Sequence, residues 1–427
     1  MKAHNILLLG SGGREHAIAW KLSQSPLCKA LYIAPGNGGT AQFGTNLSVS
    51  IADFEALKKI CIEKEITLLF PGSEEALVLG VWDYFKQDPA LAHIIVAGPS
   101  KAGAQLEGSK AFSKKFMQRH AIPTASYAEF SEDNYEEGIQ YIQAHSLPIV
   151  LKADGLAAGK GVVIAATHQE ALQAFEQMIK EAQFGEASKT VVIEAFLTGI
   201  ELSVFALSDG QHYVLLPEAK DYKRIGEGDK GLNTGGMGAI SPVPFADDNF
   251  MQKIKTAIVE PTIKGLAAEG ITYQGFIFFG LINVGGEPFV IEYNCRMGDP
   301  ETEVVMPRLE NDLVELITAM HNGQLDQVQM NFNPKASCTV MLVSGGYPEA
   351  FEKGFEIEGL QNITDSIVFH AGTKSIEQSL VTNGGRVVAI SSYGDTLKEA
   401  LQRSYQSITH IKFNQMNYRK DIGWEFE

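Results

Sequence analysis

The chain has 427 residues, of which 45% are hydrophobic and 20% charged, an ordinary composition for a globular protein of about two to four domains. Its formal net charge of −16 argues against nucleic acid or an anionic membrane as a partner. No segment approaches the roughly 18 apolar residues that a membrane span needs, and four scattered cysteines favour reduced thiols in a cytoplasmic protein.

Residues 1 to about 100 alternate apolar strand-like segments with amphipathic helical ones. Strands are expected at residues 5–10, 30–36, 66–72 and 93–100, and helices at 54–65 and 74–87. This alternation predicts a parallel sheet whose ligands lie at the carboxyl ends of the strands. Each expected strand ends in a glycine or proline turn, so the loops at that edge are expected to bind a ligand.

The first of these loops, GSGGREHA (residues 10–17), follows directly on an apolar strand. A dinucleotide fingerprint would need glycine where Glu15 stands, and a carboxylate about 20 residues further on, where the chain has APGNGGTA. Arg14, at the start of the next helix beside its first backbone N–H groups, suits a terminal phosphate monoester. A merely structural turn is the alternative, and a nicotinamide cofactor is disfavoured.

Residues 121–194 are typical of a small α+β unit, and they contain a second glycine loop, LKADGLAAGKGVVIAA (151–166). The loop differs from a P-loop in its glycine spacing, and Gly161 replaces the Ser or Thr that would bind magnesium. It also leads into a strand. The pattern predicts a hairpin that folds over a triphosphate, with Lys152 and Lys160 supplying charge; a structural hairpin with surface lysines is the alternative.

Residues 195–320 contain longer strands, at 200–210 and 275–294, and a helical stretch at 301–323. In FVIEYNCRMGDPE (289–301), Glu292, Asn294 and Arg296 alternate and are expected on one face of a strand. Two oxygen ligands at that spacing suit Mg²⁺, and the arginine can neutralise charge on a transferred phosphoryl group. An exposed polar strand face is the alternative.

Two weaker signals lie between these motifs. Glu201 follows a short apolar segment whose backbone could hydrogen-bond an adenine edge, so that its carboxylate would accept from ribose hydroxyls. KGLNTGGMGAISP (230–242) predicts a mobile glycine loop that covers a substrate. The last hundred residues predict a mainly β unit with one helix near 395–408, and His16 and His370 are interpreted as structural.

Together these segments resemble the ATP-grasp ligases. The motifs that carry the resemblance run in order from residue 10 to residue 386: GSGGREHA, APGNGGT, QLEGSKAF, LKADGLAAGKGV, DYKR, NTGGMGA, EYNCRMGDPE, FHAGTK and NGGRV. The resemblance implies a mixed α/β and α+β multidomain fold. Its expected parts are an N-terminal parallel-sheet domain (1–103), a large ATP-grasp lobe (104–120 and 195–325), a small lobe with the glycine flap (121–194) and a small, mainly β C-terminal domain (326–427).

The resemblance further implies a reaction that joins glycine to 5-phosphoribosylamine through a glycyl phosphate and converts ATP to ADP, a step of purine biosynthesis. It implies Mg²⁺ or Mn²⁺ as the metal, and we expect a monomer or weak homodimer. Arg296, Lys152 and Asp221 are the implied catalytic residues, and Glu292 and Asn294 are the implied metal ligands. The implied ATP-binding residues are Lys110, Lys152, Gly155, Gly159, Lys160, Gly161, Glu194, Phe196, Leu197 and Glu201. The implied residues for phosphoribosylamine and glycine are Gly12, Gly13, Arg14, Glu15, Asn37, Gly39, Thr40, Asp221, Gly235, Gly236, Gly298 and Asp299.

The chain departs from the family pattern at two places. Ser73 follows Gly72 where the family usually has a Gly-Pro-Glu-Ala-Pro-Leu run, although Glu74 is still available, and Met297 replaces the usual aromatic residue. Three alternatives stay open from the residues alone. They are an ATP-grasp ligase for another acid or amine, a dinucleotide-dependent oxidoreductase, and a catalytically silent nucleotide-binding regulator.

Overall fold

The computed structural model describes residues 2–156 and 161–426. The first hundred residues form the expected parallel sheet, in the strand order β3-β2-β1-β4-β5. Its strands are β1 (His4–Gly10), β2 (Cys28–Pro35), β3 (Thr45–Asn46), β4 (Leu68–Pro71) and β5 (Ile95–Val96). Helices α1 (Gly13–Ser23) and α2 (Phe54–Glu63) connect strands of this sheet. Because most residues of β1 and β4 are buried, the strands are nearly continuous apolar runs, as helices on both faces require.

The single helix predicted at 74–87 is two short helices in the structure, α3 (Glu74–Leu79) and α4 (Val81–Gln87). Gly80 between them has φ +96°, a left-handed conformation that ends the first helix. Glycine adopts this conformation without the steric cost that a side chain would add. The apolar spacing of the two helices runs on across the break, so periodicity alone did not reveal it.

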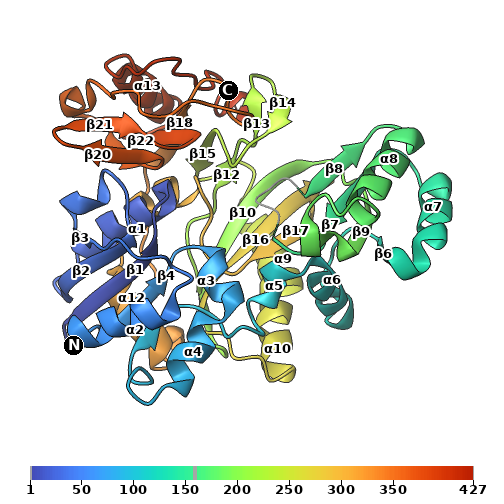
Figure 1. The fold of residues 1–427 in the computed structure, drawn as a ribbon, viewed down its shortest axis with the longest axis horizontal. Coiled ribbons are helices and arrows are strands. Elements are labelled where there is room, and N and C mark those ends of the chain that lie inside the picture. Colours follow the sequence, from blue (N-terminus) through green and yellow to red (C-terminus); the bar gives the residue numbers. More distant parts are fainter. Residues whose placement is uncertain (1, 157–160, 427) are drawn as a thin grey trace.

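The small lobe is a four-stranded antiparallel sheet with two helices (Figure 1). Its elements are β6 (Tyr127–Ser131), α7 (Tyr135–Ala144), β7 (Ile149–Ala153), β8 (Val162–Ala165), α8 (His168–Ile179) and β9 (Thr190–Ala195). The ring of Phe175 in α8 stacks on Tyr135 at 5.0 Å, which joins the two helices. The antiparallel pairing of β7 with β8 confirms the hairpin on either side of the glycine flap.

The large lobe is a second antiparallel sheet, in the order β11-β10-β16-β17. Its strands are β10 (Ile200–Ser208), β11 (Tyr213–Leu215), β16 (Gly275–Val284) and β17 (Glu287–Asn294). The helices from this part of the chain are α5 (Gln105–Gly108), α6 (Lys110–Arg119), α9 (Asp248–Ile254), α10 (Glu260–Ala268), α11 (Thr302–Arg308) and α12 (Leu313–His321). Of these, α11 and α12 also pack against α1 of the N-terminal unit. The helical stretch predicted at 301–323 is thus divided in two, and Asp312 caps α12 by accepting from the N–H groups of Val314 and Glu315.

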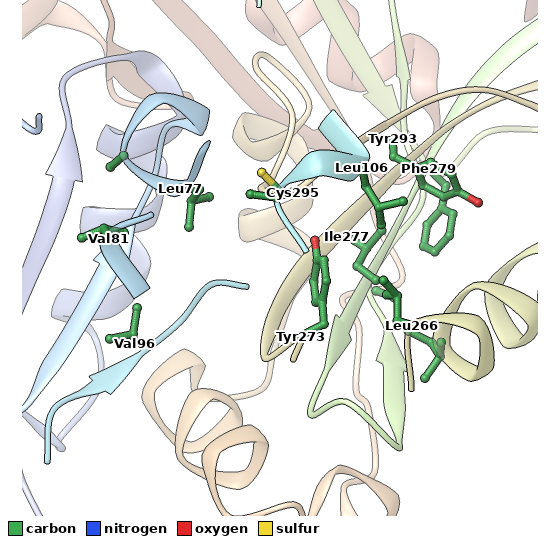
Figure 2. Close-up of a cluster of buried hydrophobic side chains, with 14 of the residues drawn as sticks. Leu77, Val81, Val96, Leu106, Leu266, Tyr273, Ile277, Phe279, Tyr293 and Cys295 are labelled. Carbon is green, nitrogen blue, oxygen red and sulfur yellow. The ribbon is translucent and has the colours of Figure 1, made fainter. Parts of the chain in front are cut away.

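One apolar core joins the N-terminal unit to the large lobe. Figure 2 shows Leu77, Val81 and Val96 on one side and Leu106, Tyr273 and Ile277 on the other, all within a single cluster of buried side chains. Each Å² of apolar surface that this cluster removes from water stabilises the fold by roughly 25 cal/mol. The carboxyl edge of the first sheet is therefore held in a fixed position relative to β16 and β17.

The C-terminal unit is a five-stranded sheet with α13 (Leu397–Ile408), in the order β12-β15-β18-β22-β19. Its own strands are β18 (Ala336–Val343), β19 (Ile367–His370) and β22 (Arg386–Gly394), with a separate hairpin of β20 (Thr373–Ile376) and β21 (Ser379–Thr382). The other two strands, β12 (Lys220–Asp221) and β15 (Gly238–Ser241), come from the middle of the chain. The sheet thus contains segments from both sides of the boundary expected at 326.

The mobile glycine loop predicted at 230–242 is mostly strand. Residues 230–233 form β14 (Lys230–Asn233), which pairs with β13 (Arg224–Gly226), and β15 follows at Gly238. Only residues 234–237 form the turn between these strands. The prediction was wrong in extent because the frequent glycines hid strand pairing with a distant part of the chain.

Two buried histidines join α1 to the C-terminal sheet. The His370 N–H donates to Nδ1 of His16, whose ring also lies 5.8 Å from that of Phe369 in an edge-on arrangement. Burial lowers the pKa of His16 to about 3 and that of His370 to about 4. Both rings are thus neutral near pH 7, as their interpretation as structural residues requires.

This pair makes folding stability dependent on pH. An unfolded histidine gains a proton below about pH 6.5 while the folded ones stay neutral, so stability is complete above that pH and is lost as the pH falls towards 4. We expect the pair to contribute a loss of roughly 3 to 4 kcal/mol between pH 7 and pH 5. Urea denaturation at both pH values checks this. The double variant His16→Gln/His370→Gln should lose clearly less unfolding free energy between pH 7 and pH 5 than the wild type. An equal loss would contradict the role of these two histidines in the pH dependence.

Candidate active site

Arg14 lies at the start of α1 and is surrounded by carboxylates. Its Nε donates to Glu15 Oε1 at 2.6 Å, and its Nη1 donates to the Met297 carbonyl at 3.2 Å. Its Nη2 lies 3.9 Å from Glu74 Oε2. The negative neighbours raise the pKa of Arg14 although burial opposes its charge, so the guanidinium is a permanent cation. Glu74, from the segment that departs from the family pattern, is thus part of the site.

The first amides of α1 already have carboxylate partners. The Gly12 N–H donates to Glu15 Oε2 at 2.6 Å, and the Arg14 N–H lies 3.4 Å from Asp299 Oδ2. Glu15 therefore serves as a capping residue of α1, which satisfies one of its unpaired donors. A phosphate group that used these amides would have to displace at least the longer contact to Asp299, so the role expected for Gly12 and Gly13 stays a prediction.

The second loop at this edge, residues 36–40, is held in place by its own side chains. Asn37 Nδ2 donates to the carbonyls of Ser11 and His370 at 2.9 and 2.7 Å, and its Oδ1 accepts from the Gly39 N–H. A Cβ atom on Gly39 would lie 2.5 Å from the ring atoms of His16 and His370, so no other residue fits there. The structure therefore gives Asn37 and Gly39 a packing role, while Thr40 donates to Asn46.

A buried ion triad lies in the small lobe at its contact with α6. Glu194 on β9 forms ion pairs with two lysines. Its Oε1 lies 2.9 Å from Lys152 Nζ of β7, and its Oε2 lies 2.9 Å from Lys114 Nζ of α6. Burial lowers the pKa of Lys114 to about 8, although Glu194 opposes that shift. The Glu194 side chain thus positions two lysines, whereas the sequence indicated only its backbone beside adenine. Lys114 was not predicted, although it stands four residues after Lys110 on the same helix face.

Lys110 lies beside the glycine flap and is within electrostatic range of Glu292 on β17. Its Nζ donates to the Gly155 carbonyl at 2.9 Å, and the charge of Glu292 opposes the lowering of its pKa that burial produces. Phe196, with 40% of its surface exposed, is one of four large apolar side chains that are exposed among the described residues from 156 to 200. The others are Leu156, Ile164 and Ile200. The adenine-side role of Phe196 and Leu197 stays a prediction, and Gly159 and Lys160 lie outside the described residues.

A single lysine holds the two acidic residues that were assigned to ribose and glycine. Lys223 Nζ lies 2.8 Å from Glu201 Oε2 and 2.7 Å from Asp221 Oδ1. These two carboxylates raise the pKa of Lys223 well above its usual value despite its burial. Lys223 comes from the DYKR motif but was not assigned a role. The structure therefore brings Glu201 and Asp221 together through one cation.

At the end of β17, three consecutive residues contact one buried carboxylate. Glu107 of α5 accepts from Asn294 Nδ2 at 2.8 Å and from the Cys295 N–H at 2.8 Å, and it lies 2.7 Å from Arg296 Nη2. Arg296 Nε also donates to Glu74 Oε2 at 3.1 Å. Asn294 and Arg296 therefore lie together, but β17 ends at Asn294, so Arg296 lies beyond the strand on whose face it was expected. Glu107 is in the QLEGSK segment, where the sequence assigned it no role.

The C-terminal unit reaches the turn at 298–301. Arg386 at the start of β22 donates to the carbonyls of Asp299 and Gly235, and its Nη1 lies 3.0 Å from Asp299 Oδ1. The Gly235 N–H donates to Tyr347 Oη at 2.9 Å. In Figure 1 this unit accordingly lies against both the N-terminal sheet and the large lobe. Gly235, Gly236, Gly298 and Asp299 are thus brought together, with Arg386 as a partner that the sequence did not predict.

Comparisons with known proteins agree with this arrangement. Three sequence models of phosphoribosylglycinamide synthetase match in order: the N domain over residues 4–107, the ATP-grasp (A) domain over 108–302 and the C domain over 337–425. The phosphoribosylamine–glycine ligase of Vibrio cholerae is 47% identical over 424 residues, covering 98% of this chain and 97% of that protein. The chain belongs to the phosphoribosylamine–glycine ligase family. Another relative, from Haemophilus influenzae, is 46% identical over 98% of this chain and 98% of its own length.

Solved structures agree with this family assignment. The crystal structure of the phosphoribosylamine–glycine ligase of Thermotoga maritima superposes with a TM-score of 0.85 at 35% identity, covering 98% of this chain and 99% of that one. A biotin carboxylase from Campylobacter jejuni has a TM-score of 0.73 at 14% identity, covering 99% of this chain and 94% of that one. The second likeness shows the fold alone. The predicted ATP-grasp fold, with its N-terminal parallel sheet and small C-terminal β unit, is confirmed.

The donor set at the end of β17 fits a divalent metal. Glu292 offers a carboxylate, and the amide nitrogen of Asn294 is bound to Glu107, which leaves its oxygen for a ligand. Among residues 2–156 and 161–426, no cluster of three or more His, Cys, Asp or Glu side chains is arranged to hold a metal. Mg²⁺ needs only one or two protein oxygens when phosphates and water complete its coordination.

Proposed function

We propose that this chain joins glycine to 5-phosphoribosylamine, forming glycinamide ribonucleotide and converting ATP to ADP and phosphate, as a step of purine biosynthesis. One observation carries the proposal: Glu74 lies within ion-pair distance of both Arg14 and Arg296. The loop assigned to the phosphoribosyl group therefore meets the strand assigned to the metal and phosphates. A ligase needs this, because its amine must reach a carboxylate activated by ATP.

The chemistry proceeds in two steps. The glycine carboxylate takes the γ-phosphoryl group of ATP, which forms an acyl phosphate and releases ADP. The amine of phosphoribosylamine then attacks the carbonyl carbon; the C–N bond forms, the C–O bond to phosphate breaks, and one proton leaves the nitrogen. We assign no protein nucleophile, because positioning and charge neutralisation are sufficient for both steps.

We propose for the side chains the roles that the family resemblance implies. Arg296 neutralises charge that develops on the transferred phosphoryl group, and Lys110 and Lys152 contact the phosphates of ATP. Asp221 and the turn at 298–301 hold glycine, while Glu201 accepts from the ribose. Glu292 and Asn294 would hold Mg²⁺ or Mn²⁺, which supplies charge neutralisation at the phosphates when bound. The flap at 155–161 would exclude water from the acyl phosphate.

The finer properties are also proposals. We propose a monomer or weak homodimer, located in the cytoplasm, with small molecules as its only ligands and neither nucleic acid nor membrane as a partner. Every helix in the described part of the chain is too short or too polar to qualify as a membrane span. We retain the four expected domains, 1–103, 104–120 with 195–325, 121–194, and 326–427, as a working division.

ADP release from Mg·ATP tests the function, with phosphoribosylamine generated in the reaction and amino acids supplied one at a time. We expect ADP only when glycine and phosphoribosylamine are both present, together with a product of the mass of glycinamide ribonucleotide. ADP formed with a different acid or amine would overturn the substrate assignment and keep the ligase chemistry. Folded protein that turns over no nucleotide would instead favour a nucleotide-binding regulator.

A further inference from the structure

The carboxylate of Glu107 is buried beneath the end of β17, with 8% of the residue exposed. Its Oε1 accepts from Asn294 Nδ2 at 2.8 Å and lies 2.7 Å from Arg296 Nη2. Its Oε2 accepts from the Cys295 N–H at 2.8 Å and from the Cys295 thiol at 3.0 Å. A carboxylate offers about four lone-pair positions, so this one is fully used by three consecutive residues.

This contact decides which end of the Asn294 amide faces outward. An amide has a donating nitrogen and an accepting oxygen of nearly equal size, and only the oxygen can bind a hard cation. An ionised carboxylate can only accept, and the neighbouring donors, the Cys295 N–H and the Arg296 guanidinium, secure its position. The Asn294 nitrogen must therefore point to Glu107, and its oxygen points away.

We propose that Glu107 is a positioning residue for the metal site, which holds the amide oxygen of Asn294 ready for a divalent cation. The inference rests on the proposed role of Asn294 as a metal ligand, and it adds a residue from α5, 187 positions away in the sequence. Outer partners of this kind typically change metal affinity by about 10- to 100-fold when they are removed. Glu107 acts through Asn294 and does not itself contact the cation.

Glu107→Gln changes this arrangement in a defined way. The Cys295 N–H is a backbone donor and cannot turn, so we expect the oxygen of the introduced amide to remain on it. The new NH₂ group then faces Asn294 and the Arg296 guanidinium, a side chain that can move aside. Two amide NH₂ groups cannot hydrogen-bond to each other, because both only donate. Asn294 must therefore rotate its own amide so that its oxygen accepts from the introduced side chain. The Asn294 nitrogen then faces the cation site. The double variant E107Q/N294D restores an accepting group on both sides of residue 294.

Direct Mn²⁺ binding tests the proposal, with free Mn²⁺ measured by its electron paramagnetic resonance signal in the presence of ADP. We expect E107Q to raise the Kd for Mn²⁺ by at least about tenfold, and E107Q/N294D to recover most of that loss. Binding by E107Q within twofold of wild type overturns the proposal. So does a double variant that binds no more tightly than E107Q.

Glu74→Gln is the matched control, because Glu74 also pairs with Arg296 but forms no hydrogen bond with Asn294 among the described residues. We expect E74Q to keep the Kd for Mn²⁺ within about twofold; a loss equal to that of E107Q would show that general charge is responsible and would overturn the positioning role. If circular dichroism shows E107Q to be unfolded, Mn²⁺ binding by the single variant Asn294→Asp tests the proposal instead. The added charge would ordinarily tighten binding, whereas a carboxylate opposite Glu107 should weaken it, and tighter binding overturns the proposal.

These outcomes are separable from those of the proposed function. If the wild-type chain forms no glycinamide ribonucleotide but E107Q still weakens Mn²⁺ binding, the positioning role stands and the substrate assignment falls. If the wild-type chain makes the product and E107Q binds Mn²⁺ normally, the function stands and the positioning role falls.

Discussion

Glu292→Ala is expected to lower turnover by roughly 10³-fold at saturating substrates, while the fold survives. A metal at a phosphoryl group supplies several kcal/mol of charge stabilisation, and each 1.36 kcal/mol corresponds to about tenfold in rate. The Glu292 side chain forms no hydrogen bond or ion pair with the residues that the structure describes. Its charge does offset the burial of Lys110, so we expect its removal to lower the pKa of that lysine further without breaking a hydrogen bond.

Two measurements distinguish a loss of catalysis from a loss of stability in this variant. ADP release reports turnover, and a thermal melt reports stability, which should change little because Glu292 is only half-buried. Raising the Mn²⁺ concentration should recover part of the lost rate if the defect is metal affinity. Near-normal turnover at ordinary Mg²⁺ would remove Glu292 from the metal site.

Arg296→Ala is expected to abolish measurable turnover and also to destabilise the protein by about 3 to 5 kcal/mol, the usual result of removing one partner from a buried ion pair. Arg296 pairs with both Glu107 and Glu74. Burial opposes the ionisation of Glu74, yet Arg296 and Arg14 outweigh it and lower the pKa of that carboxyl to about 2. Without Arg296, Glu74 and Glu107 would share a partly buried space, and Arg14 would be the cation beside Glu74.

The pH dependence of stability gives this prediction a second readout. Since the pKa of Glu74 is lowered in the folded state, its contribution is complete above the unfolded value of about 4.5 and is lost as the pH falls towards 2. Arg296→Ala should make that acid loss smaller. Urea denaturation at pH 7 and pH 4 checks both the loss of stability and its slope, with turnover corrected for the folded fraction. Arg296→Lys serves as the control, because lysine keeps the charge but not the fork that joins two carboxylates.

The sequence by itself determined the local elements and the chemistry available. Alternating apolar segments specified the parallel sheet of residues 1–100, since a strand buried on both faces must be apolar. The spacing of Glu292 and Asn294 specified one face of a strand, since side chains alternate along a strand, whereas Arg296 lies beyond the end of that strand. Ordered motifs indicated the ATP-grasp fold. Each of these depends on residues close together in the chain.

The tertiary structure decided which charges meet. Glu107 binds residues 294–296, and Glu194 joins Lys114 to Lys152, across separations that no periodicity reports. Likewise, β12 and β15 join the C-terminal sheet, so part of the predicted glycine loop is strand. The charge of an ionised side chain can be read from the sequence. Its partner is determined only when packing brings distant segments within a few ångströms and removes the competing water.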